Sequence, residues 1–165
     1  MSRRSVLEGG ARIAGAGAAV MALGSMVLTP SQALAQASGV QPEEELSQTM
    51  ERLFAKRPIK DAGDMMDFKI PVIAENGSVV PARVEVKSAA VAKGKFVKAI
   101  YLIVDKNRRP MTAKYTFSAD AGGALVGTNL RLGATSNVRA VAEMSDGSLF
   151  QATQEVRVTV GGCGG

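Results

Sequence analysis

Most of the chain alternates apolar and polar side chains over short stretches that end in turn-forming residues. The stretch VPARVEVKS (80–88) places three valines and an alanine on one face, with a proline and three charged residues on the other. This period of two is typical of a half-buried strand. About seven or eight such stretches occur at spacings of roughly 8 to 12 residues. We therefore predict a mainly β fold, an antiparallel immunoglobulin-like β-sandwich.

Two turns predict how neighbouring strands pair. Asn76–Ser78 separates DFKIPVIA (67–74) from the strand at 80–88, which predicts a hairpin. An Asp-Gly turn at 146–147 predicts a second hairpin between NVRAVAEM and LFQATQEVRVTV (149–160). KAIYLIVD (98–105) is apolar on both faces, which indicates a central strand.

One helix is predicted before the strands, over QPEEELSQTMERLFAKRP (41–58). Pro42 suits a first helical position, and Glu43–Glu45 would lie at the positive end of the helix dipole. The apolar residues recur at helical spacing, at Leu46, Met50, Leu53 and Phe54. This stripe is expected to cover a sheet of the same domain, with partner binding as the alternative.

The first 35 residues have the composition of an export signal. Arg3 and Arg4 precede a short apolar run, and Ala33-Leu34-Ala35 offers the small-x-small pattern of a signal peptidase site. Paired arginines indicate the twin-arginine route, so we predict cleavage after Ala35, a periplasmic protein and no membrane attachment afterwards. A retained anchor helix is the alternative, although the apolar run is short for a membrane span.

Few side chains are equipped for catalysis. The chain has no histidine and one cysteine, so it lacks the commonest general base and the ligands of a zinc site. No cofactor is expected. The net charge of +5 is small for a nucleic-acid-binding domain, and we predict no nucleic-acid partner. Two basic clusters, 93–98 and 106–109, are interpreted as solvated strand edges, or alternatively as a patch for an acidic partner.

The single cysteine lies in the last eight residues, VTVGGCGG. Alternation of Val156, Val158 and Val160 predicts a strand anchored in the core up to Val160. After it, Cys163 is the only side chain, flanked by Gly161, Gly162, Gly164 and Gly165. Glycine leaves the backbone freely jointed, so we predict a flexible, thin arm that can carry a thiol into another protein's narrow pocket.

The thiol has no evident activator in its own chain. A thiolate is the reactive form, Arg157 lies six residues back in the strand, and the Gly165 carboxylate opposes a nearby anion. Activation is therefore expected from partners, which indicates a carrier and not an enzyme. Three alternatives are a secreted structural β-domain with an intermolecular disulfide, an inert tail, and a carrier that uses its terminal carboxylate.

The complete Gly-Gly-Cys-Gly-Gly ending, after a twin-arginine signal and a β domain, resembles the SoxY family of sulfur carriers in bacterial thiosulfate oxidation. The predicted organisation is a signal peptide at 1–35, a linker and helix at 36–63, a β-sandwich carrier domain at 64–160 and the arm at 161–165. Glu8 departs from the lysine that twin-arginine signals often carry.

The resemblance implies partners and a reaction sequence. A SoxZ-like subunit would form a heterodimer with the chain. A haem enzyme would couple thiosulfate to Cys163, giving a cysteine S-thiosulfonate. A hydrolase would release sulfate, and a sulfur dehydrogenase would oxidise the remaining sulfane sulfur.

Overall fold

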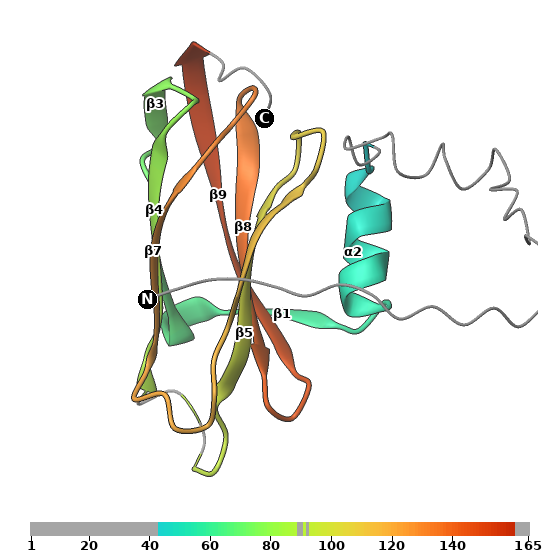
Figure 1. The fold of residues 1–165 in the computed structure, drawn as a ribbon, viewed down its shortest axis with the longest axis vertical. Helices are drawn as coiled ribbons and strands as arrows, with labels where there is room; N and C mark the ends of the chain where they lie inside the picture. Colours follow the sequence, from blue (N-terminus) through green and yellow to red (C-terminus); the bar gives the residue numbers. More distant parts are fainter. Residues whose placement is uncertain (1–42, 89–90, 92, 161–165) are drawn as a thin grey trace, which may run out of the picture. The chain divides into compact units, whose positions relative to one another are not determined.

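The structure, a computed structural model, describes residues 43–88, 91 and 93–160. In this part of the chain two β-sheets face each other, and one α-helix lies outside them (Figure 1). A short 3-10 helix, η1 (Gly63–Met65), precedes β2. The predicted mainly β sandwich with an N-terminal helix is thus confirmed. None of the described helices has the length and apolar character needed to cross a membrane.

The larger sheet has six strands, in the order β1–β9–β8–β5–β6, with β3 also paired to β9. Its strands are β1 (Ile59–Asp61), β3 (Ile73–Asn76), β5 (Val97–Val104), β6 (Met111–Thr116), β8 (Ser136–Met144) and β9 (Leu149–Val160). The long pairs β5–β6, β5–β8 and β8–β9 are antiparallel. β1 and β3 instead run parallel to β9, one beside its start and the other beside its end.

The smaller sheet packs against this one through a shared apolar core. It has the order β2–β4–β7, and its strands are β2 (Met66–Lys69), β4 (Val80–Val86) and β7 (Ala124–Leu130). Along β4 the burial alternates as the sequence predicts, with Val80 and Val84 fully buried. They share one cluster with Ile100, Leu102 and Val138 of the larger sheet. The inter-sheet core therefore follows directly from the period of two in the sequence.

β5 is buried on both faces, which confirms the predicted central strand. Ile100 and Leu102 face the smaller sheet, whereas Tyr101 and Ile103 face the helix. The helix, α2 (Leu46–Phe54), buries Phe54 in this second cluster. The Phe54 and Tyr101 rings meet edge to face, with centroids 5.2 Å apart. The predicted apolar stripe thus covers a sheet of its own domain.

The helix is shorter than the predicted span of 41–58. It begins at Leu46, after the cap residue Glu45, whose backbone N–H donates to the Gln48 side chain at 3.3 Å. The acidic residues before it make other contacts. Glu44 accepts two 2.7 Å hydrogen bonds from Arg52, and this interaction holds the Glu44 pKa at about 2. Glu43 pairs with Arg108 in the loop after β5. Glu43 and Glu44 therefore lie before the first turn of the helix, and their ion pairs hold the segment that precedes it.

A buried carboxylate fixes the other end of the helix to the sheet. Glu143 of β8 accepts hydrogen bonds from Tyr101 Oη at 2.9 Å and from Arg57 Nη1 at 3.1 Å. Arg57 Nε also donates to the Phe54 carbonyl at 3.2 Å. Burial raises the pKa of Glu143, but these bonds and the charge of Lys98 outweigh it and lower the pKa overall. The same burial and the bond to Glu143 raise the pKa of Tyr101 to about 12. These groups serve to hold the structure together.

Of the two predicted hairpins, one is confirmed and the other holds only for its first part, because Asp67–Lys69 pair antiparallel with Arg83–Glu85. β8 and β9 pair as a hairpin, with Gly147 at φ 82° in the turn. The stretch 67–74 is not one strand, because Pro71, which cannot donate a ladder hydrogen bond, separates β2 from β3. β2 pairs with β4 and β3 pairs with β9. The turn at 77–78 therefore links the two sheets and does not close a hairpin.

Candidate functional site: the root of the C-terminal arm

The last strand changes its partner just before the described chain ends. Pairing between β8 and β9 extends to Val156, opposite Ser136. From Arg157 to Val160, β9 pairs with β3, at the tip visible in Figure 1. The final four residues of β9 therefore have β3 as their paired strand. The sequence instead predicts that 67–74, which includes the start of β3, pairs with the strand at 80–88.

Several hydrogen bonds hold this final stretch in place. The Gly77 N–H donates to the Val160 carbonyl at 2.8 Å, and the Thr159 hydroxyl donates to the Glu75 carbonyl at 2.8 Å. On the other side, the Val158 N–H donates to the Thr135 hydroxyl at 3.0 Å. The backbone is thus fixed up to the residue before Gly161. Any arm beyond it starts from a rigid root.

The side chains are less buried here than the alternation predicts. Val156 is fully buried, Val158 is half-buried, and Val160 is 63% exposed. The prediction that the core extends to Val160 is therefore wrong for the side chain. The physical reason is the loss of β8 as a neighbour, because Val160 pairs with Asn76 at the sheet edge. The strand is anchored at its end by hydrogen bonds of its backbone and of threonine hydroxyls, and not by apolar burial.

The predicted site residues themselves lie outside the described part of the chain. These are Cys163 with the glycines at 161, 162, 164 and 165, and the export residues Arg3, Arg4, Ala33 and Ala35. Chain geometry still limits what an arm can reach. Five residues span at most about 17 Å, and the third of them lies at most about 10 Å from the root.

Glu143, whose pKa is lowered, lies far from this root. Glu143 pairs with Leu149, at the opposite end of β9, roughly 35 Å along the strand from Val160. Within the described residues there is no cluster of three potential metal ligands. The basic cluster at 93–98 is largely ion-paired, through Lys95 with Asp146 at 2.5 Å and Lys98 with Glu143 at 3.5 Å. These lysines are exposed, but Lys98 lies on the central strand β5 and Lys95 in the loop before it, so they do not lie on a strand edge.

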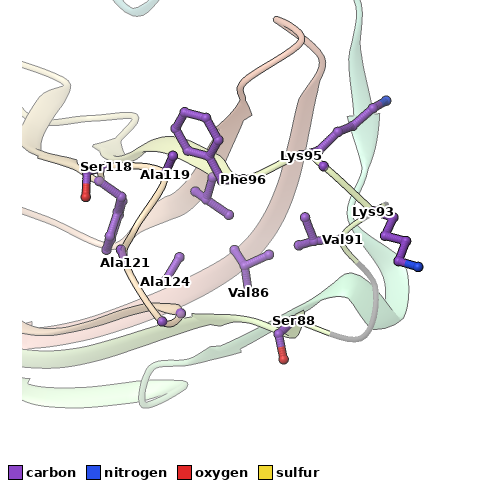
Figure 2. Close-up of a pocket in the computed structure, with 15 residues that line it drawn as sticks. Val86, Ser88, Val91, Lys93, Lys95, Phe96, Ser118, Ala119, Ala121 and Ala124 are labelled. Atoms are coloured by element: carbon purple, nitrogen blue, oxygen red, sulfur yellow. The ribbon is translucent and has the colours of Figure 1, made fainter.

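A cavity of about 240 Å³ lies at the end of the sandwich away from the root, between the loops that follow β4 and β6. Val86, Val91 and Phe96 are among its lining residues, and the side chains of Lys93 and Lys95 extend away from it (Figure 2). The cavity is mainly apolar and offers no acid–base pair. It does not contribute to the site at the root.

The fold and this root define a class of protein: a small β-sandwich whose last described strand ends at a fixed, exposed edge. The profile of the family described as "Sulfur oxidation protein SoxY" matches residues 50–163, a range that includes Cys163. The chain belongs to the SoxY family. This membership assigns it a carrier role in sulfur oxidation.

Solved structures agree with this assignment. The sulfur carrier protein SoxY from Chlorobium limicola f. thiosulfatophilum is 27% identical, with a TM-score of 0.58. The match covers 70% of this chain and 97% of that chain. A superoxide reductase (neelaredoxin) from Ignicoccus hospitalis is 18% identical over 57% of this chain and 80% of its own, with a TM-score of 0.50. The latter likeness concerns the fold alone. No curated protein sequence matches the chain significantly.

The sequence reasoning missed the residues that build the root. Asn76 and Gly77 form the turn beside Val160, with Asn76 Oδ1 accepting from the Ser78 N–H at 2.8 Å. The sequence predicts a turn at this Asn-Gly pair, but the position of the turn beside Val160 depends on the β3–β9 pairing. Pro71 is the one local signal in the sequence that the stretch 67–74 divides into two strands, because proline cannot donate a ladder hydrogen bond.

Proposed function

We propose that this protein is a periplasmic covalent sulfur carrier, which holds sulfur intermediates on Cys163 while partner enzymes act on them. The observation that carries the proposal is the Gly-Gly-Cys-Gly-Gly terminus directly after a strand fixed to its last residue. A rigid root with a thin extension brings one thiol to a pocket and keeps the rest of the domain outside. Family membership, with a match that reaches Cys163, supports this proposal.

Loading joins the thiol to the sulfane sulfur of thiosulfate. The Cys163 S–H bond breaks and a sulfur–sulfur bond forms, giving a cysteine S-thiosulfonate. One proton goes to solvent, and two electrons pass to a haem-containing coupling enzyme. A free thiol is mostly protonated at neutral pH, so the coupling enzyme must favour the thiolate.

Unloading proceeds by hydrolysis and oxidation. A hydrolase adds water across the terminal sulfur–sulfur bond, which releases sulfate and leaves a persulfide on Cys163. A sulfur dehydrogenase then oxidises the outer sulfur to a sulfonate, with three waters supplying oxygen and six electrons passing to the enzyme. A second hydrolysis releases sulfate and restores the thiol. Covalent attachment keeps each intermediate near a recognised domain throughout.

The proposal includes export and assembly. Arg3 and Arg4 direct the chain through the twin-arginine route, with removal of residues 1–35 after Ala35. The mature chain forms a heterodimer with a SoxZ-like subunit that has no carrier cysteine. The chain itself does not perform the chemical steps, because its partners supply the electron acceptors and the activated water.

Intact-mass spectrometry tests covalent carrying directly. Mature protein incubated with thiosulfate and its coupling enzyme should gain the mass of one thiosulfate, and fragmentation should place the addition on Cys163. Protein without the enzyme should stay unmodified. If the main product is instead a disulfide-linked dimer, and dithiothreitol removes function along with it, the structural alternative is correct.

Widening the arm should slow transfer without changing stability. Gly162→Val is expected to lower the loading rate at least about tenfold, because a β-branched side chain obstructs entry into a pocket and restricts the backbone. A matched control is Gly122→Val, in a loop where an added Cβ would meet no atom within 4 Å. Loading rates and melting temperatures of both variants check this. Equal loading by wild type and Gly162→Val would remove the requirement for a thin arm.

A further inference from the structure

The loop between β7 and β8, residues 131–135, takes the place of β8 beside the end of β9. The pairing of β8 with β9 reaches Ser136, which lies opposite Val156. Two residues further along β9, the Val158 N–H donates to the Thr135 hydroxyl at 3.0 Å. A side chain of the loop therefore supplies the kind of hydrogen bond that a longer β8 would supply from its backbone.

The same loop is linked to Val160, the last residue of the strand. The Leu132 N–H donates to the Gly77 carbonyl at 2.7 Å, and the Gly77 N–H donates to the Val160 carbonyl at 2.8 Å. Apolar burial contributes little at this end, because Val158 is half-buried and Val160 is exposed. These hydrogen bonds therefore have a large part in fixing the point at which the ordered strand ends.

A buried asparagine in another loop holds the β7–β8 loop in this shape. Asn107, in the loop after β5, is 8% exposed. Its Nδ2 donates to the Arg131 carbonyl at 2.7 Å, and its Oδ1 accepts from the Gly133 N–H at 3.2 Å. Both ends of the amide are thus bonded to the loop backbone, one on each side of Leu132. Asn107 is therefore connected to the end of β9 through this loop.

We propose that Thr135 is a positioning residue for Cys163, because its hydroxyl fixes the residue at which the arm begins, and that Asn107 acts through it. This proposal rests on the covalent carrier function. If residues 157–160 came away from the sheet, the last fixed residue would be Val156. Cys163 would then lie seven residues beyond the fixed chain instead of three.

The length of the free chain sets how often the thiol reaches a pocket of an enzyme that holds the domain. The effective concentration of a tethered group falls roughly as the −3/2 power of the tether length. A change from three to seven residues therefore lowers the effective concentration of the thiol about three- to fourfold. The hydroxyl of Thr135 keeps the arm short and its starting point constant.

A valine in place of Thr135 removes the hydrogen-bond acceptor and keeps the shape of the side chain. In Thr135→Val a methyl group faces the Val158 N–H, so hydrogen exchange of this amide should become about tenfold faster. In the mature protein with its partner subunit, the rate at which the haem coupling enzyme loads Cys163 at saturating carrier should fall about threefold, with KM for the carrier unchanged. Thr135→Ser, which keeps the hydroxyl, should restore both values. Thr153→Val, at an exposed position of the same strand, should leave both unchanged.

The two measurements fail in different ways. Unchanged exchange at Val158 in Thr135→Val would show that the hydroxyl does not hold the strand. Faster exchange with wild-type loading would show that a fixed root does not help the arm. Either result overturns the proposal. A wild-type carrier that is never loaded would instead contradict the proposed function, and the exchange measurement does not depend on loading, so the two failures are distinguishable.

A longer arm tests whether the effect of Thr135 comes from arm length. Insertion of four glycines between Val160 and Gly161 should slow loading about three- to fourfold and leave exchange at Val158 unchanged. Adding Thr135→Val to the lengthened chain should slow loading only about twofold more, because the same release extends an arm that is already long. A further loss as large as in the chain of normal length would overturn the arm-length role.

A double-mutant comparison tests the role of Asn107. Asn107→Asp keeps Oδ1 but cannot donate to the Arg131 carbonyl, so it should also speed exchange at Val158. Combined with Thr135→Val, it should add less than it does alone, because both changes act on the same hydrogen bond. Fully additive effects would show that Asn107 does not act through Thr135.

Discussion

Replacing Cys163 with serine should reduce thiosulfate oxidation in a reconstituted system to background. A serine hydroxyl has the shape of the thiol but cannot form the sulfur–sulfur bond that holds the intermediate. The measurement is sulfate release or electron transfer with all partner enzymes present. Stability is expected to stay the same, because Cys163 lies beyond β9, which ends at Val160. Normal turnover by Cys163→Ser would exclude the carrier function.

A relocated thiol provides a sharper control. Thr159→Cys in the Cys163→Ser background puts the same reactive group on the rigid end of β9, at an exposed position. Its sulfur should react with iodoacetamide, yet enzymatic loading should stay at background because the strand and β3 prevent entry into a pocket. Efficient loading of this variant would show that a thiol near the root is sufficient and that the arm is unnecessary.

Removal of the Phe54 ring should destabilise the fold strongly. Phe54→Ala should lower the free energy of unfolding by about 3–5 kcal/mol, the usual loss for a buried aromatic residue. Phe54 is 1% exposed and contacts the Tyr101 ring, so its loss leaves a cavity between α2 and the larger sheet. Urea denaturation of the mature protein measures the change.

Two controls show whether the loss of stability in Phe54→Ala is specific to the buried ring. Leu125→Ala, on an exposed surface, should change the free energy of unfolding by less than about 0.5 kcal/mol. At temperatures where Phe54→Ala is still folded, loading of Cys163 should remain normal, because the helix contacts the end of β9 that is remote from the arm. A loss below about 1 kcal/mol for Phe54→Ala would mean that the helix contributes little to stability.

The sequence alone was sufficient to predict features that depend on a short repeat of apolar residues along the chain. Alternation predicted the inward residues of β4, two apolar faces predicted the central position of β5, and the helical stripe predicted that α2 covers a sheet. Each depends on side chains a few residues apart, whose common face is set by backbone geometry. The Gly-Gly-Cys-Gly-Gly ending likewise pointed to the SoxY family before any fold was known.

Features that depend on distant partners were not predictable in this way. The split of 67–74 at Pro71 was readable as a break, but nothing local indicates that β3 pairs with β9, more than 80 residues away in sequence. The exposure of Val160 follows from that pairing, because an edge position has one neighbouring strand. The helix α2 begins at Leu46 and not at residue 41 as predicted. Here too a distant partner is involved, since Glu43 contacts Arg108 in a loop that is remote in sequence.

The parallel pairing of β3 with the end of β9 also determines how the domain resists tension. A force along β9 toward its C-terminal end would act on the hydrogen bonds of this strand to β3 and β8 in shear. Bonds sheared together share the load, whereas bonds at a peeled end break one after another. The end of β9 would therefore resist such a force through several hydrogen bonds at once.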